Sequence, residues 1–423
     1  LGLTKFLRSD KLDAKLSKYV VMMEATPRGL AAFAQQGADQ KKLIDDLLAD
    51  ESLLLQIVIA DGAKGGKYGA AMTIYSAIQK ASQKSQKGCL QRLALAVALE
   101  HAVSLAQGNP AAKKDAPKTV DPVKRYLHYE KAYLGKELDQ AFKGLTVWEY
   151  RMIVDGRQPD EIIAWGREML RSYRPDHITN PDYRWRYVGV VKTDIRYCGG
   201  YNRIVRPELQ YTQHILMNGG VCGRRAFFGR FVLRAFGIPA AARPSPGHGA
   251  LAHWTPDGWV ICLGGGWGVG HTRTRYGADV NFLATTQARS SGKEFLRVKR
   301  AQWIGDVMGE TRTFGLYSGK QEYWYGVSLC TRRAVIDDAK AVALAAVGTD
   351  LGEANVSKVK EAVKTVTISD EDRKIVVGNN GVITIPAAAC SKPTGNTGRI
   401  KFMPSNHGGM QLHYSRTGNA ETF

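Results

Sequence analysis

The chain has 423 residues, a hydrophobic content of 44% and a formal net charge of +20 at pH 7, from 59 Lys and Arg against 39 Asp and Glu. This length predicts two or three domains, and the composition is that of a soluble globular protein. No apolar run approaches the roughly 20 residues that a membrane-spanning helix needs, so the sequence predicts no membrane span.

The positive charge predicts attraction to anionic partners, such as acidic proteins, anionic polysaccharide, nucleic acid or anionic lipid. The basic residues are spread along the chain and form no nucleic-acid-binding signature, so specific nucleic-acid binding is not expected. Six cysteines without a C-x-x-C pair predict neither a disulfide framework nor a structural zinc site. The chain begins at Leu1 and not at Met. That start is typical of a processed or trimmed product, and it leaves the compartment open, with secreted and organellar destinations included.

Residues 1–106 are rich in Ala, Leu, Lys and Gln. Two stretches there, KKLIDDLLADESLLLQIVIA and CLQRLALAVALEHAVSLA, carry apolar residues at helical spacing, so we expect an N-terminal helical domain. Residues 107–122 (QGNPAAKKDAPKTVDP) have no apolar periodicity and predict a linker. We expect a connecting helix to follow over about 123–144.

Residues 145–300 are richer in Trp and Tyr and are interrupted by Gly and Pro. A helix is predicted in PDEIIAWGREMLRSYRP and a strand in WRYVGVVKTDIRY, at 185–197. Residues 301–364 are expected to be mixed and partly helical, with a helix over 323–347. Short β runs separated by turn residues at 365–423 predict a β-rich accessory region. The expected fold class is therefore α+β.

The stretch GGVCGRRAFFGRFVLRAFGIP, residues 219–239, places one cysteine behind a glycine pair that permits a tight turn. The apolar run after it predicts a mostly buried helix, and Gly237 fits the C-terminal cap. Cys222 is then at the helix N-terminus, where unpaired amides, the helix dipole, Arg224 and Arg225 favour the thiolate. The same position also suits a small buried residue, and position alone does not decide between the two.

The next segment, PGHGALAHWTPDGWVICL, predicts a β-hairpin with Pro-Asp-Gly at its turn and Trp259–Leu263 as its return strand. His248 and His253 are five residues apart, so on a regular strand they face opposite sides. A joint metal site is therefore not expected, and at most one of them faces Cys222. A histidine on a strand against the cysteine helix would supply a base for the thiol.

These blocks resemble the transglutaminase-like superfamily. Its pattern is a G-x-C at a helix start, an apolar helix closed by G-I-P-A, a strand that carries histidine, and a return strand from Trp to Asp. The resemblance covers about residues 185–285 and implies a papain-like core within 145–300. It assigns Cys222 as the nucleophile and His248 as its base. Four further residues are expected to flank the site: His253, Trp254, Trp259 and Trp267.

The chain departs from the family at the third catalytic residue. An Asp usually follows the return-strand Trp by about four positions, and here Leu263 stands at that position. A carboxylate normally holds the histidine in the right tautomer and stabilises the imidazolium. The site is therefore a Cys–His dyad, or borrows Asp279 or His271 as its third member, or is inactive.

The resemblance implies a thiol acyltransferase, in which Cys222 attacks a glutamine carboxamide of a protein or peptide and His248 transfers the protons. This chemistry needs no metal or cofactor, and the sequence has no EF-hand loop. Two alternatives stay open. One is a cysteine protease or amidase on the same fold, and the other is a non-catalytic structural or binding protein on a degenerate scaffold. Anionic polysaccharide or an acidic protein is a further candidate partner, and the oligomeric state is undecided.

Overall fold

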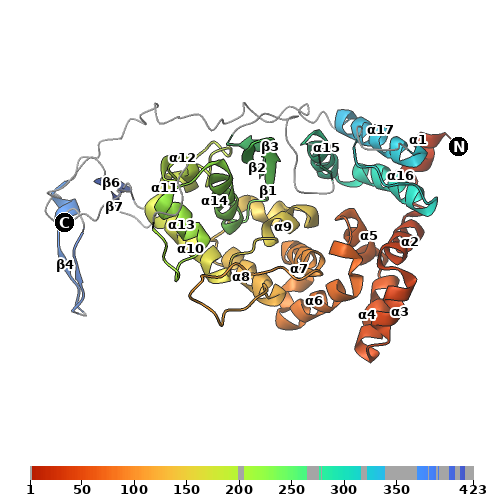
Figure 1. Cartoon of the computed structure of the whole chain (residues 1–423), viewed down its shortest axis with the longest axis horizontal. Helices are drawn as coiled ribbons and strands as arrows, with labels where there is room; N and C mark the ends of the chain where they lie inside the picture. Colours follow the sequence, from red (N-terminus) through yellow and green to blue (C-terminus); the bar gives the residue numbers. More distant parts are fainter. Residues whose placement is uncertain are drawn as a thin grey trace.

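The computed structural model is mainly helical, with three small antiparallel sheets in the described part (Figure 1). The α+β class is therefore as the sequence predicts. The structure describes residues 2–198, 204–263, 276–277, 279–315, 322–338, 369–379, 381–386, 389, 400–404 and 410–414.

The first hundred residues fold into α-helices, with short 3-10 turns between some of them, as their composition predicts. The helices are α1 Leu3–Arg8, α2 Asp13–Ala25, α3 Pro27–Ala34, α4 Ala38–Ala49, α5 Glu51–Ile59, α6 Tyr68–Ala81 and α7 Gly88–His101. Side-chain caps start two of them, since Thr26 accepts from the amide of Gly29 and Asp50 accepts from the amide of Leu53. α7 is apolar on most of its circumference and is accordingly buried on most sides.

One hydrophobic cluster extends from these helices across the expected linker at 107–122. It contains residues of α2 and α5 to α7 together with Tyr126 of α8 (Pro122–Leu134) and Tyr150 of α9 (Val147–Val154). The segment before α8 forms no helix or strand and contributes one isolated bridge, from Ala106 to Thr119. The connecting helix expected over 123–144 is divided, because α8 ends at Leu134 and a 3-10 turn, Gln140–Gly144, follows.

A second hydrophobic cluster is built around α14. The elements of this region are α10 Asp160–Tyr173, α11 Pro175–Ile178, α12 Val190–Thr193, α13 Tyr211–Asn218 and α14 Cys222–Ala235. The strand predicted at 185–197 is wrong, because that stretch forms turns and the short helix α12. Val188 and Val191, three residues apart, are both buried in this cluster. A short apolar run of this kind suits a buried helical turn as well as a strand.

Three antiparallel strands form a sheet in the order β1-β2-β3, which packs against α14 through β1 and β2 (Figure 1). They are β1 Ala240–Ser245, β2 His248–Thr255 and β3 Gly258–Cys262. The predicted hairpin is confirmed, and Thr255 pairs with Gly258 across a two-residue turn. Helix and sheet approach closely at Gly229, where a Cβ would lie 2.7 Å from Leu251 Cδ2. This contact holds the two elements that carry the predicted nucleophile and base.

The C-terminal third begins with α15 Asp279–Ser290, α16 Phe295–Val307 and α17 Tyr323–Asp338. α16 packs against both α17 and the N-terminal helix α2 (Figure 1). Two small hairpins follow, β4 Val376–Val377 with β5 Ile383–Thr384, and β6 Ile400–Pro404 with β7 Met410–Tyr414. They agree with the short β runs that the sequence predicts. None of the helices in the described ranges combines the length and apolarity needed to cross a membrane.

Candidate functional site

Cys222 is the first residue of α14, as the sequence predicts. The preceding turn needs glycine at Gly219, where φ is 74° and a Cβ would lie 2.3 Å from the carbonyl oxygen of Arg196. Val221 occupies the N-cap without a side chain that could accept from the helix. Within the described part of the chain, the amides of Cys222 and Gly223 therefore have no hydrogen-bond partner. Gly223 and Val221 are exposed, so the helix N-terminus is open to solvent.

The start of β2 lies directly against this helix N-terminus. The amide of Gly249 donates to Cys222 Sγ over 3.3 Å. A Cβ on Gly249 would lie 2.9 Å from the Cα of Gly223, so glycine permits the contact. His248 precedes Gly249, and covalent geometry therefore keeps its Cα within about 6 Å of the sulfur. The main chain at His248 is thus close to the sulfur of Cys222.

His248 is half-buried, and its Nε2 lies 2.7 Å from the main-chain oxygen of Leu263. A carbonyl oxygen can only accept a hydrogen bond, so Nε2 carries the proton. In the neutral ring, Nδ1 is then the nitrogen with the free lone pair. The Leu263 carbonyl is therefore sufficient to set the tautomer.

Leu263 directly follows β3 and has a φ of 72°, in the left-handed region that a branched side chain rarely adopts. Its side chain is fully buried in the cluster around α14. The main-chain oxygen of Leu263 is the group that bonds to His248. Sequence reasoning missed this group, because every residue has a carbonyl and nothing in the local sequence marks Leu263 for a left-handed conformation.

For the two candidate third members of the site, Asp279 and His271, the structure describes no side-chain atom. His271 lies outside the described residues, as does Trp267, which was expected to flank the site. Asp279 is the first residue of α15, and its side chain also lies outside the described part. The main-chain oxygen of Leu263 is thus the partner of His248 that the structure describes.

His253 is fully buried, and its two ring nitrogens lie near backbone carbonyls, to one of which the neutral ring can donate. Its Nδ1 lies 3.1 Å from the oxygen of Trp254 and its Nε2 lies 3.2 Å from the oxygen of Arg184. Burial lowers the pKa of His253 to about 4, so the ring is neutral near pH 7. It joins β2 to the segment before α12.

The two tryptophans of the hairpin belong to the core. Trp259 is buried and meets Phe282 edge-on, with ring centroids 4.9 Å apart. Trp254 is partly buried and contacts three hydrophobic clusters. These contacts fix the hairpin on the helices behind it and so hold His248 in place.

The chain matches no family model, no curated protein and no solved structure. A functional assignment therefore depends on the residues of this chain and on their geometry. In the described ranges, no group of three His, Cys, Asp or Glu side chains is arranged to hold a metal ion.

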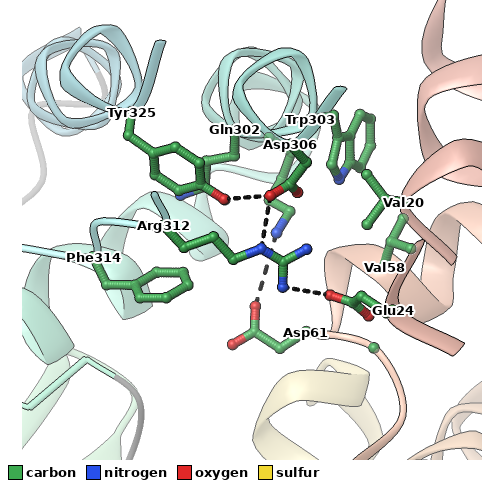
Figure 2. Close-up of a pocket in the computed structure, with 12 residues that line it drawn as sticks. Val20, Glu24, Val58, Asp61, Gln302, Trp303, Asp306, Arg312, Phe314 and Tyr325 are labelled. Atoms are coloured by element: carbon green, nitrogen blue, oxygen red, sulfur yellow. Dashed lines mark hydrogen bonds and ion pairs between the residues drawn. The ribbon is translucent and has the colours of Figure 1, made fainter. Parts of the chain in front are cut away.

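A separate polar cavity lies between the N-terminal helices and α16 (Figure 2). At its centre, Arg312 donates to Glu24 of α2 over 2.8 Å and to Asp306 of α16 over 2.7 Å. Burial by itself lowers the pKa of Arg312, but Asp306 and Glu24 outweigh it and raise that pKa above its ordinary value. Asp61 beside them accepts from Arg289 over 2.6 Å. These charges pair with one another across elements far apart in sequence, so we interpret the cavity as a structural junction.

Proposed function

We propose that this protein is a transglutaminase-like thiol acyltransferase that acts on glutamine carboxamides through a thioester on Cys222. The main support is one arrangement of atoms. The Gly249 amide bonds to Cys222 Sγ, and the adjacent residue, His248, has its tautomer fixed by Leu263. A thiol at a helix N-terminus, close in the fold to a histidine of fixed tautomer, suits thiol acyl transfer.

In the first half of the reaction, Nδ1 of His248 accepts the thiol proton and the sulfur of Cys222 attacks the carboxamide carbon. The carbonyl oxygen gains the negative charge, and the amides of Cys222 and Gly223, which have no partner among the described residues, are suitable donors to it. The Leu263 carbonyl stabilises the imidazolium through Nε2. When the C–N bond breaks, His248 returns the proton to the leaving group, which departs as ammonia and leaves a thioester.

In the second half, an amine attacks the thioester, His248 accepts its proton, and the thiol leaves with a proton restored. Water can replace the amine, which converts the transferase into an amidase. Exposure of Gly223 and Val221 leaves the helix N-terminus accessible to water. That observation favours hydrolysis as the second candidate function.

The test is incubation with a glutamine peptide and a fluorescent primary amine, with ammonia release and amine incorporation measured separately. Ammonia with incorporation supports the acyltransferase, and ammonia alone supports the amidase. Cys222→Ser should abolish both signals, whereas Cys330→Ser, which changes an exposed thiol on α17, should change neither. Failure to release ammonia from any glutamine or peptide substrate would leave the non-catalytic scaffold as the better description.

A further inference from the structure

Aromatic side chains surround the N-terminus of α14. Tyr197 is 53% exposed and forms a bridge with Gly220, two residues before Cys222. Tyr211, the first residue of α13, is 44% exposed and meets Phe227 of α14 at a centroid distance of 5.2 Å. Such exposed rings near a reactive thiol provide flat apolar surface for a bound chain.

Each of these tyrosines lies beside an arginine from the first turn of α14. The guanidinium carbon of Arg225 is 5.5 Å from the Tyr197 ring centroid, and that of Arg224 is 5.8 Å from the Tyr211 ring centroid. Arg225 is buried and donates to the carbonyl of Val191, so it serves as an anchor. Arg224 is partly exposed and follows Cys222 by two positions in the chain.

A second surface arginine lies close to the first. Arg196 is exposed, and its carbonyl accepts from the amide of Gly220 over 3.0 Å. The stem of Arg224 crosses the same glycine, where a Cβ would lie 2.6 Å from Arg224 Cβ. The main chain of Arg196 and the stem of Arg224 therefore both lie against Gly220.

The two acidic residues on the segments 190–198 and 204–218 each lie within ion-pair distance of an arginine. Asp194 is 2.7 Å from Arg174, and Glu208 is 3.6 Å from Arg206. The segments 190–198 and 204–218 hold no other Asp or Glu. The surface next to Cys222 thus has an excess of positive charge, which attracts carboxylates.

From this arrangement we infer that the acyl donor is an acidic peptide segment, in which Asp or Glu flanks the reactive glutamine. Arg196 and Arg224 would bind the flanking carboxylate, because a guanidinium matches its geometry. Tyr197 and Tyr211 would hold the peptide chain. The inference depends on the proposed function, since it names the substrate of Cys222. A peptide is favoured over a polysaccharide because the reacting group must carry a carboxamide.

The first test compares alkylation of Cys222 by iodoacetate, an anion, and by iodoacetamide, its neutral analogue, in the full chain at low salt. We expect the ratio of the two rates to exceed that of a model thiol and to fall about twofold for Arg224→Ala and for Arg196→Ala. Arg28→Ala, on an exposed residue of α3, removes the same charge and should leave the ratio unchanged. A ratio that is insensitive to salt and to both arginines would overturn the inference.

The second test measures how well peptides protect Cys222 from iodoacetamide. Glutamine peptides flanked by Glu should protect at a concentration at least about fivefold lower than matched peptides flanked by Lys, as expected for a charge-assisted contact. Arg224→Ala should reduce that difference. Equal protection by both peptides, or stronger protection by heparin than by either, would overturn the acidic-peptide assignment. A Cys222 thiol that does not react with iodoacetamide at all would instead overturn the proposed function, so the two failures are distinguishable.

Discussion

His248 donates from Nε2 to the main-chain oxygen of Leu263 over 2.7 Å. Among the residues that the structure describes, a backbone carbonyl therefore orients this histidine. A neutral dipole fixes the tautomer as well as a carboxylate does, but it stabilises the imidazolium less. We expect a working base, with slower turnover than a complete triad would give.

The thiol of Cys222 should react before the others. Limited iodoacetamide at about pH 6.5 should label Cys222 first, because its thiol lies at a helix N-terminus that is open to solvent. Cys262 is buried and should stay unlabelled until the protein unfolds. His248→Ala should slow labelling of Cys222 and leave that of exposed Cys330 unchanged. Peptide mass spectrometry gives both rates, and equal labelling of Cys222 and Cys330 would contradict the prediction.

Substitutions at Leu263 separate its carbonyl from its side chain. Leu263→Ala keeps the carbonyl, so the labelling rate of Cys222 should persist while stability falls by about 2–5 kcal/mol from the cavity created. Leu263→Asp puts a carboxylate into the apolar cluster around α14, so it should destabilise the fold and give no gain in activity. Urea unfolding and amine incorporation report the two effects. A gain of activity in Leu263→Asp would mean that the side chain, and not the carbonyl, faces His248.

Gly249 should be intolerant of any side chain. Gly249→Ala places a Cβ 2.9 Å from Gly223 Cα, so β2 must move away from α14 and the bond to Cys222 Sγ is lost. We expect a loss of about 1–3 kcal/mol in the free energy of unfolding, together with slower labelling of Cys222. Gly223→Ala is the matched control, because a Cβ at Gly223 meets nothing within 4 Å. Similar behaviour of the two variants would refute the packing argument.

Buried His253 should make the fold sensitive to mild acid. Its pKa is about 4 in the folded chain and about 6.5 when unfolded, so between these values the unfolded chain binds a proton that the folded chain does not. Its contribution is complete above about pH 6.5 and is lost as the pH falls toward 4. His253→Gln should reduce proton uptake on unfolding by about one at pH 5, measured as the slope of unfolding free energy against pH. Identical slopes for both proteins would show that His253 does not contribute.

The junction in Figure 2 should be costly to break. Asp61→Asn leaves Arg289 buried without its 2.6 Å carboxylate contact and should cost about 3–5 kcal/mol. Asp337→Asn removes the partner of Arg333 in an exposed pair on α17 and should cost less than about 1 kcal/mol. Urea midpoints compare the two variants, and equal small losses would mean that the buried pair adds no stability.

Local pattern was sufficient for several parts of this protein. The glycine pair, the apolar run and Gly237 predict α14 with Cys222 as its first residue, and the structure has both. The turn residues after Trp254 predict the β2–β3 hairpin. Each of these features depends on residues close together in the sequence, where helix caps and turn preferences act.

The tertiary structure decided the features that depend on distant contacts. Val188 and Val191 suit a strand by composition, but burial against α14 leaves them in turns and a helix. One apolar cluster likewise contains residues from both sides of 107–122, so it packs together helices that the sequence analysis assigned to separate units.

The orientation of His248 is the clearest case of what sequence alone cannot provide. The sequence determined that Leu263 stands where a carboxylate was expected. By itself, this substitution predicts that the group that orients the histidine is missing. In the fold, the Leu263 side chain packs into the cluster around α14 and the Leu263 backbone is left-handed. The Leu263 carbonyl oxygen then lies 2.7 Å from Nε2 of His248. A carbonyl is common to all residues, so only the path of the folded chain decides which one meets His248.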